Sequence, residues 1–230
     1  MMKLIFTKKN ESMTRLIFLD FDGTLIDSRQ RLYTLFCELV PENTFSFKEY
    51  WQIKRGRINQ RDLLRHYFHY SDAQVDVFRR KWMEKIEEPE RLAMDVPFEG
   101  ITKFLLHAAQ DVFIYLITAR QYPMRVVTQI QQFGWQDYFT DILVTSQRQS
   151  KSALIRAETD YTHDDMLVGD TGEDIIAGKE LGVTTVAVTT GILSEAVLRE
   201  YQPDQLLETV VMLDIAYSSP HQIREALNGQ

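Results

Sequence analysis

The 230-residue sequence contains a single cysteine, Cys37, and no apolar run near the roughly 20 residues needed to cross a bilayer. One cysteine excludes an internal disulfide, and the apolar neighbours of Cys37 predict a packed thiol rather than a reactive one. The first residues, Met1 to Phe6, meet Lys8 and Lys9 before the apolar core of a signal peptide can develop. We therefore expect a cytoplasmic protein with no membrane partner.

Positive charge is also scarce, with 26 Lys and Arg against 33 Asp and Glu and a net charge of -7. Such a chain has no general attraction for nucleic acid or anionic lipid, so we expect neither as a partner. An anionic substrate would then need a local source of positive charge, either a basic patch or a metal ion among carboxylates. No pattern singles out a surface for self-association.

Hydrophobic residues make up 44% of the chain, enough for one large domain or a core with a smaller attached domain. Short apolar runs predict buried strands at Arg15–Leu19, Val112–Ile117, Asp141–Val144, Met166–Val168 and Thr184–Val188. Helix-like stretches lie between them at Phe98–Ala109, Pro123–Phe133 and Glu173–Leu181, the last followed by Gly182. This alternation predicts an α/β fold with a parallel sheet.

Between the first two predicted strands, apolar residues recur at helical spacing. Two helix faces stand out, formed by Leu32, Leu35, Phe36 and Leu39 and by Leu63, Leu64, Tyr67 and Phe68. Asn59 and Ser71 are expected helix caps. We therefore predict an all-helical domain at residues 29–95, inserted into a core domain of residues 1–28 and 96–230. Its hinges would lie near Asp27 to Arg29 and Met94 to Pro97.

Polar groups follow three of the predicted strands, at the sheet edge where parallel α/β proteins bind ligands. The three segments are Asp20-Phe21-Asp22-Gly23-Thr24, Thr118-Ala119-Arg120 and Gly169-Asp170-Thr171-Gly172-Glu173-Asp174. In strand geometry Asp20 and Asp22 would project to one face, which costs repulsion unless a cation lies between them. With Asp170 and Asp174 they offer enough hard oxygen for Mg²⁺.

Each of these motifs also has an ordinary structural explanation. Asp-x-Asp-Gly is common in plain turns, because Asp and Gly both favour them. Asp170 and Thr171 could cap the next helix, with Asp174 in its first turn. Thr118 could be an ordinary strand end, and Lys151 a solvated surface lysine. Taken one at a time, the motifs leave the function open.

The order of the motifs favours function. A strand ending in paired aspartates, then Thr118, then Lys151, then Gly-Asp-x-x-x-Asp, resembles haloacid dehalogenase-like hydrolases of the helical-cap subfamily, whose familiar type is phosphoglycolate phosphatase. The most specific segments are Phe18 to Ser28 and Val168 to Ile175. The resemblance implies a three-layer, Rossmann-like α/β core with a parallel sheet and an inserted all-helical cap domain. It also implies a magnesium-dependent phosphatase that acts on a small phosphorylated metabolite.

The same resemblance implies roles for the carboxylates. Asp20 would attack phosphorus and form an aspartyl-phosphate, and Asp22 would protonate the leaving oxygen and then activate water. Family members that dehalogenate lack an acid at the position of Asp22, so its presence favours phosphoryl transfer. Gly23 would permit the turn that aims Asp22 inward. The implied ligands of Mg²⁺ are Asp20, Asp170 and the backbone carbonyl of Asp22, with Asp174 supporting Asp170 or binding the metal through water.

Thr118 and Lys151 would hold the phosphoryl oxygens. In the family the lysine motif often continues with prolines, whereas Lys151 here enters its helix directly. Arg148 and Arg120 are therefore alternative phosphate contacts. Lys151 is preferred, because a lysine at a helix start can reach back over the strand ends.

A basic cluster within the predicted insertion comprises Lys54, Arg55, Arg57 and Arg61. It would suit a second anionic group on the substrate, or equally a solvated helix end. Alternative functions on the same scaffold are a phosphomutase and a phosphonate hydrolase, and a non-catalytic phosphate-binding or regulatory protein is a third. A phosphonate hydrolase needs a cap lysine for an imine, and spacing marks neither Lys48 nor Lys54 for that role.

Overall fold

The computed structural model describes residues 15–215, so the expectations for Met1 to Phe6, Lys8 and Lys9 lie outside the described residues. Six parallel strands form one sheet in the order β5-β4-β1-β6-β7-β8. Their bounds are β1 Leu16–Leu19, β4 Phe113–Thr118, β5 Asp141–Val144, β6 Met166–Gly169, β7 Thr184–Val188 and β8 Gln205–Leu207. The predicted parallel α/β sheet is confirmed, and each of the five predicted strands is present within one residue at either end.

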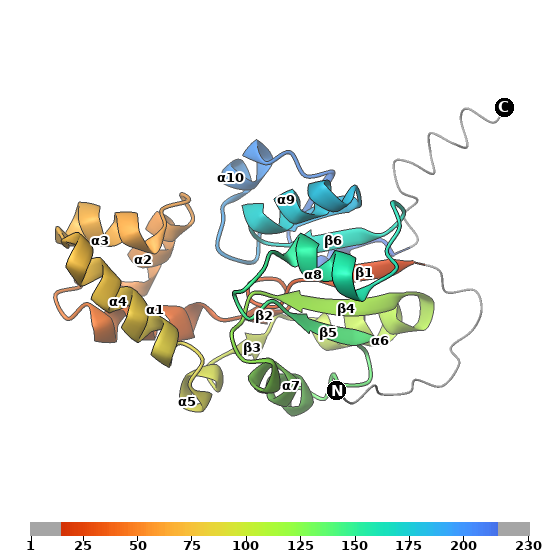
Figure 1. The fold of residues 1–230 in the computed structure, drawn as a ribbon, viewed down its shortest axis with the longest axis horizontal. Coiled ribbons are helices and arrows are strands. Elements are labelled where there is room, and N and C mark those ends of the chain that lie inside the picture. Colours follow the sequence, from red (N-terminus) through yellow and green to blue (C-terminus); the bar gives the residue numbers. More distant parts are fainter. Residues whose placement is uncertain (1–14, 216–230) are drawn as a thin grey trace.

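Helices cover both faces of this sheet and give three layers (Figure 1). One face is covered by α6 (Ile101–Asp111) and α7 (Pro123–Gln132), whose apolar residues share a core cluster with β1 and β4. The other face is covered by α8 (Lys151–Glu158), α9 (Gly172–Leu181) and α10 (Glu195–Glu200). A short 3₁₀ helix, Val210–Met212, ends the described chain next to α6.

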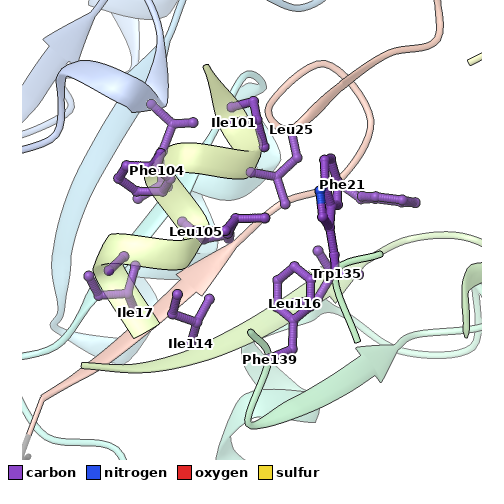
Figure 2. Packing of buried hydrophobic residues seen from close by; sticks show 14 of the residues in the cluster. Ile17, Phe21, Leu25, Ile101, Phe104, Leu105, Ile114, Leu116, Trp135 and Phe139 are labelled. Carbon is purple, nitrogen blue, oxygen red and sulfur yellow. The ribbon is translucent and has the colours of Figure 1, made fainter. Parts of the chain in front are cut away.

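The core beneath α6 shows why the strand sequences are almost uniformly apolar. Figure 2 shows Phe104 and Leu105 of α6 above Ile17 of β1 and Ile114 of β4. A parallel sheet buries both of its faces, so neighbouring positions on a strand must all be apolar. Trp135 belongs to this cluster, and its Nε1 donates to Thr102 Oγ1 at 2.9 Å, so the indole N–H is paired.

Two parts of the core differ from the sequence expectation. The predicted helix at Phe98–Ala109 begins three residues late, because Gly100 has a left-handed φ of +81° that an α-helix cannot contain. The last strand, β8, was not predicted, since Gln205 and its neighbours are only half buried and show no strong apolar pattern.

The helical insertion, residues 29–92, comprises α1 Arg29–Leu39, α2 Phe47–Lys54, α3 Gln60–Phe68, α4 Asp72–Lys85 and α5 Pro89–Leu92. It projects from one end of the sheet (Figure 1). Two short strands, β2 (Ile26–Asp27) and β3 (Val96–Pro97), pair in antiparallel fashion where the insertion joins the core. The chain therefore leaves and re-enters the core at one place, where the sequence predicts the hinges.

The insertion has its own apolar cluster, in which Phe36, Leu63 and Leu64 are fully buried. The expected caps are confirmed, since Asn59 accepts from Asp62 N and Ser71 from Gln74 N. Tyr67 was expected on the buried face and is 48% exposed, in ring contact only with Phe45, so that assignment is wrong. Within residues 15–215, no helix has the length and apolar character that crossing a membrane requires.

Candidate active site

A pocket of about 240 Å³ opens at the carboxyl ends of β1, β4 and β6. β1 lies between β4 and β6, so the residues that follow these three strands meet at one edge of the sheet. The six residues singled out from the sequence all line the pocket, namely Asp20, Asp22, Thr118, Lys151, Asp170 and Asp174.

Three buried carboxylates lie close together in this pocket. Asp20, Asp170 and Asp174 each offer an oxygen, and these oxygens lie within 4.8 Å of one another. Lys151 Nζ lies 2.5 Å from Asp20 Oδ1 and 2.5 Å from Asp174 Oδ1. A cluster of three carboxyl groups therefore contains one ammonium, which contacts two of them, and this excess of negative charge suits a divalent cation.

Burial and the excess of negative charge raise the pKa values of two carboxyl groups in the cluster. Burial raises the pKa of Asp20 to about 7, with Asp174 adding to the rise and Lys151 opposing it. Burial, together with the charges of Asp20 and Asp174, raises the pKa of Asp170 well above its ordinary value. Without a further cation, the raised pKa values mean that Asp20 and Asp170 hold their protons more strongly than solvated carboxyls do.

Asp170 has one oxygen in use and one free. Its Oδ2 accepts from Ile192 N at 2.7 Å, whereas its Oδ1 is buried without a hydrogen-bond partner among residues 15–215. A buried, unpaired oxygen in a carboxylate cluster is an available ligand for a hard cation, so the residues present fit Mg²⁺. Gly23 has a φ of +85°, and a Cβ there would lie 2.5 Å from Asp170 Oδ2. The predicted turn at Gly23 is thus confirmed, and it brings the backbone against Asp170.

Asp174 takes part both in the capping of helix α9 and in the carboxylate cluster. Its Oδ2 accepts from the backbone N (3.1 Å) and Oγ1 (2.6 Å) of Thr171, which fixes the first turn of α9. Its Oδ1 is the atom that faces Lys151. Helix capping therefore orients the carboxylate toward the pocket.

Lys151 is the first residue of α8, and Ser150 caps that helix by accepting from Ala153 N. The lysine is buried, so the interpretation as a solvated surface residue is wrong. Although burial opposes it, Asp174 and Asp20 raise the pKa of Lys151 above its usual range, so the side chain is an ammonium. The alternative residue, Arg148, is exposed and is not among the residues that line the pocket.

Asp22 lies in the same pocket, outside the carboxylate cluster. Arg31 Nη2 lies 2.5 Å from its Oδ1, and Arg120 approaches with two donors, Nε at 2.7 Å from Oδ2 and Nη2 at 2.8 Å from Oδ1. Burial alone would raise the pKa of Asp22, but the charges of Arg120 and Arg31 hold it below its usual range. Asp22 is therefore ionised in this arrangement, and Arg120, an alternative phosphate contact, is occupied by carboxylates.

Residues 16–188 match the family described as haloacid dehalogenase-like hydrolase. The chain belongs to this family. It is 23% identical over 217 residues to the pyrophosphatase PpaX of Halalkalibacterium halodurans, covering 86% of this chain and 95% of that protein. The matched range includes Phe18 to Ser28 and Val168 to Ile175, the two most specific segments of the resemblance.

Two solved structures share the haloacid dehalogenase-like fold. A haloacid dehalogenase-like family hydrolase of Streptococcus pneumoniae superposes with a TM-score of 0.66 at 20% identity, covering 95% of this chain and 99% of that one. A predicted phosphoglycolate phosphatase of Haemophilus somnus has a TM-score of 0.67 at 18% identity, covering 88% and 97%. At these identities the likeness establishes the fold alone.

Sequence reasoning missed one feature of this haloacid dehalogenase-like site, a buried ion-pair network that involves Asp95. Arg31 Nε lies 2.8 Å from Asp95 Oδ1, and Arg120 Nη2 lies 3.0 Å from Asp95 Oδ2. Gln129 Nε2 donates to the same carboxylate at 3.0 Å. The sequence signal that could have found this network was position, since Arg31 lies two residues after the first predicted hinge and Asp95 lies within the second.

The basic cluster of the insertion does not act as one unit. Arg55 donates to the carbonyls of Gly191 (2.9 Å) and Thr189 (3.2 Å) in the loop that follows β7. Arg57 pairs with Glu200 at 3.2 Å on the surface. Lys54 and Arg61 line a second cavity, which lies within the insertion. The cluster therefore divides between contacts to the core and the lining of that cavity.

Proposed function

We propose that this hydrolase is a Mg²⁺-dependent phosphatase that removes phosphate from a small phosphorylated metabolite, with Asp20 as the nucleophile. One observation supports this above the others, namely the meeting of the Asp20, Asp170 and Asp174 carboxylates around a single lysine, with a buried oxygen of Asp170 left unpaired. Asp22, in the same pocket and two residues from Asp20, supplies the acid that phosphoryl transfer needs.

In the proposed first step, a carboxylate oxygen of Asp20 attacks phosphorus, and the bond from phosphorus to the alcohol oxygen of the substrate breaks. Asp22 gives its proton to that alcohol oxygen. In the second step, Asp22 takes a proton from water, whose oxygen attacks phosphorus and releases the Asp20 carboxylate with inorganic phosphate.

Asp22 must therefore alternate between two protonation states. The ionised form that Arg120 and Arg31 stabilise is the one that accepts a proton from water in the second step. The first step needs the protonated form, so the contact with at least one guanidinium group has to weaken before the alcohol departs.

The remaining residues bind the phosphoryl group and the metal. Lys151 has three N–H donors, of which two are directed at carboxylates, so one remains for a phosphoryl oxygen. Thr118 is buried at the end of β4 and offers a hydroxyl to the same group. Mg²⁺ would be held by Asp20, Asp170, Asp174 and the backbone carbonyl of Asp22, and would neutralise charge on the phosphoryl oxygens.

The helical insertion, with residues 29–95 as its proposed domain limits, would cover this pocket. Leu32, Trp82 and Met83 of the insertion line the pocket opposite the carboxylates. Such a cover excludes water and selects the substrate.

The test is phosphate release from phosphoglycolate, sugar phosphates, nucleotides and pyrophosphate, with and without Mg²⁺. We expect Mg²⁺-dependent turnover that disappears in Asp20→Asn and persists in Asp76→Asn, whose aspartate is exposed on α4. Turnover that survives in Asp20→Asn would contradict the proposal. Transfer of phosphate to a second hydroxyl of the substrate, instead of to water, would identify a phosphomutase.

A further inference from the structure

The helical insertion supplies most of the lining of a cavity of about 510 Å³, separate from the carboxylate cluster. It lies between α2, α3 and α4, and Leu32 and Trp82 line both this cavity and the active-site pocket. Ile192 of the core also lines it, and the backbone N of Ile192 is the donor that holds Asp170. The cavity therefore adjoins the site of the proposed chemistry.

The charge of this cavity is the opposite of that of the pocket below it. Lys54, Arg61 and Arg79 line it, and no acidic residue does among residues 15–215. The buried ammonium of Lys54 donates only to neutral oxygens, Ile58 O at 2.9 Å and Gln60 Oε1 at 3.1 Å. A buried charge without a counter-charge is costly, and Lys54 has no acidic partner among residues 15–215, whereas Arg61 and Arg79 are exposed members of the lining.

The walls of the cavity are aromatic. Tyr50, Trp51, Phe78 and Trp82 line it, and the Phe78 and Trp82 rings are stacked with centroids 5.5 Å apart. The Trp51 side chain is 6% exposed, and its Nε1 donor has no acceptor in the described part of the chain. A buried indole nitrogen usually has a partner, so this wall lacks one acceptor.

We propose that this cavity binds the alcohol part of the substrate, and that this part combines a flat ring system with a second anionic group, a carboxylate or a phosphate. The inference rests on the proposed phosphatase function and narrows its substrate class. Aromatic walls bind the ring, the cations bind the anion, and Trp51 Nε1 donates to a ring or anion oxygen.

The volume of the cavity and the charge of its lining both disfavour a small alcohol as the part of the substrate that binds there. A buried cavity of about 150 Å³ already accommodates benzene, so this one has room for fused rings with a charged substituent. Phosphoglycolate carries an anionic group without a ring, and it would leave the aromatic walls unfilled. A neutral ring would leave the cations unpaired. The favoured substrates therefore carry both features.

The test is calorimetric titration of the protein, in buffer with Mg²⁺, with 2-naphthoate, 2-naphthylmethanol and acetate. We expect 2-naphthoate to bind about tenfold or more tightly than either of the others, since only it satisfies both the ring walls and the cations. Arg79→Gln and Lys54→Met should each weaken binding of 2-naphthoate by about tenfold, the loss expected for one charge-assisted hydrogen bond.

Arg80→Gln is the matched control. Arg80 is the neighbour of Arg79 on α4 and is exposed outside the cavity lining, so binding of 2-naphthoate should be unchanged. Trp51→Phe keeps a ring and removes the N–H donor. It should lower the affinity for 2-naphthoate more than the affinity for 2-naphthylmethanol. Equal affinities for the three probes, or equal effects of Arg79→Gln and Arg80→Gln, would overturn the proposal.

The two proposals fail in different ways. Binding of 2-naphthoate with the expected losses, but no phosphate release from any ester, would retain the cavity as a ring-acid site and reject the phosphatase. Phosphate release from small esters without binding of 2-naphthoate would retain the phosphatase and reject the cavity as its specificity site.

Discussion

Arg31 forms an ion pair with Asp22 that joins the helical insertion to the active-site pocket, with Nη2 2.5 Å from Oδ1. The same guanidinium group contacts Asp95 and the carbonyl of Ile86, so its orientation is fixed by three acceptors. A planar, multidentate cation held in this way sets the direction of the Asp22 carboxylate. Arg31 is therefore a positioning residue for the proposed acid and base.

Replacing Arg31 by Met should lower kcat by roughly ten- to a hundredfold, because misplacement of a proton-transfer group by about 1 Å has effects of that size. KM for a small phosphate ester should change little, since binding of the phosphoryl group is assigned to Lys151 and Thr118. Steady-state kinetics measure the split. Arg31→Lys retains the charge without the planar fork and should recover only part of kcat, and a rise in KM at constant kcat would refute the positioning role.

Removal of the Asp95 carboxylate should destabilise the fold. Asp95→Ala would leave the buried Arg31 and Arg120 with Asp22 as their remaining carboxylate partner, and breaking such a buried pair costs about 3 kcal/mol or more. Urea unfolding measures this loss. Asp76→Ala, at an exposed position of α4, should stay within about 0.5 kcal/mol of the parent. A similar small change in both variants would show that the network does not stabilise the protein.

Asp170→Asn should raise stability in the absence of metal and reduce the stabilisation that Mg²⁺ gives. Because burial and the neighbouring aspartates raise the pKa of Asp170, its ionised form lowers stability above the pKa of a solvated carboxyl, and Asn removes that penalty. Asp170→Asn should therefore melt higher than the parent at about pH 8 without metal. Saturating Mg²⁺, at about a hundred times its Kd, should stabilise the parent by about 2.7 kcal/mol and the variant much less.

Thermal unfolding with and without Mg²⁺ measures both effects. Glu99→Gln removes an exposed carboxylate outside the pocket and should respond to Mg²⁺ as the parent does. An equal response in Asp170→Asn would remove Asp170 from the proposed metal ligands.

Lys54 should make stability depend on alkaline pH. Burial lowers the pKa of Lys54 to about 8. Between that value and about 10.4, the unfolded chain holds the proton and the folded chain does not. Stability therefore rises with pH across this window, by at most about 1.4 kcal/mol for each unit. Lys54→Met should remove the rise and increase stability below pH 8.

Urea unfolding at about pH 7 and about pH 9.5, compared between parent and variant, tests this sign. Lys48→Met replaces an exposed lysine in the same helix and should leave the pH dependence as it is in the parent. A parent and a Lys54→Met protein with the same dependence would show that Lys54 is not desolvated in the insertion.

The sequence was sufficient to predict the positions of the site residues that lie at the ends of strands. Asp20, Thr118 and Asp170 come immediately after apolar runs, and parallel strands bring their carboxyl ends to one edge. Lys151 was placed from its position at a helix start. Only the direction of these side chains, such as the lysine between Asp20 and Asp174, needed the structure.

Features that depend on distant contacts were not accessible in the same way. Arg31 and Asp95 are 64 residues apart and meet only because β2 and β3 bring the two ends of the insertion together. Lys54 and Arg55 are adjacent in sequence, yet they face a cavity and the core respectively, since one helical residue turns the side chain by about 100°. The clustering of basic residues in the sequence therefore did not predict which of them line the cavity and which contact the core.

The contact of Arg55 with the loop after β7 makes separation of the insertion from the core at this point a step with its own barrier. Arg55 donates to two carbonyls of that loop, and its own carbonyl accepts from Ser194 N at 3.1 Å, so the insertion is tied to the core far from the β2–β3 ribbon. Any movement of the insertion away from this loop would break these hydrogen bonds. Because the acceptors are neutral carbonyls, added salt would screen this contact less than it screens an exposed ion pair. The on-rate of substrate should therefore stay nearly constant with ionic strength in so far as this opening limits it.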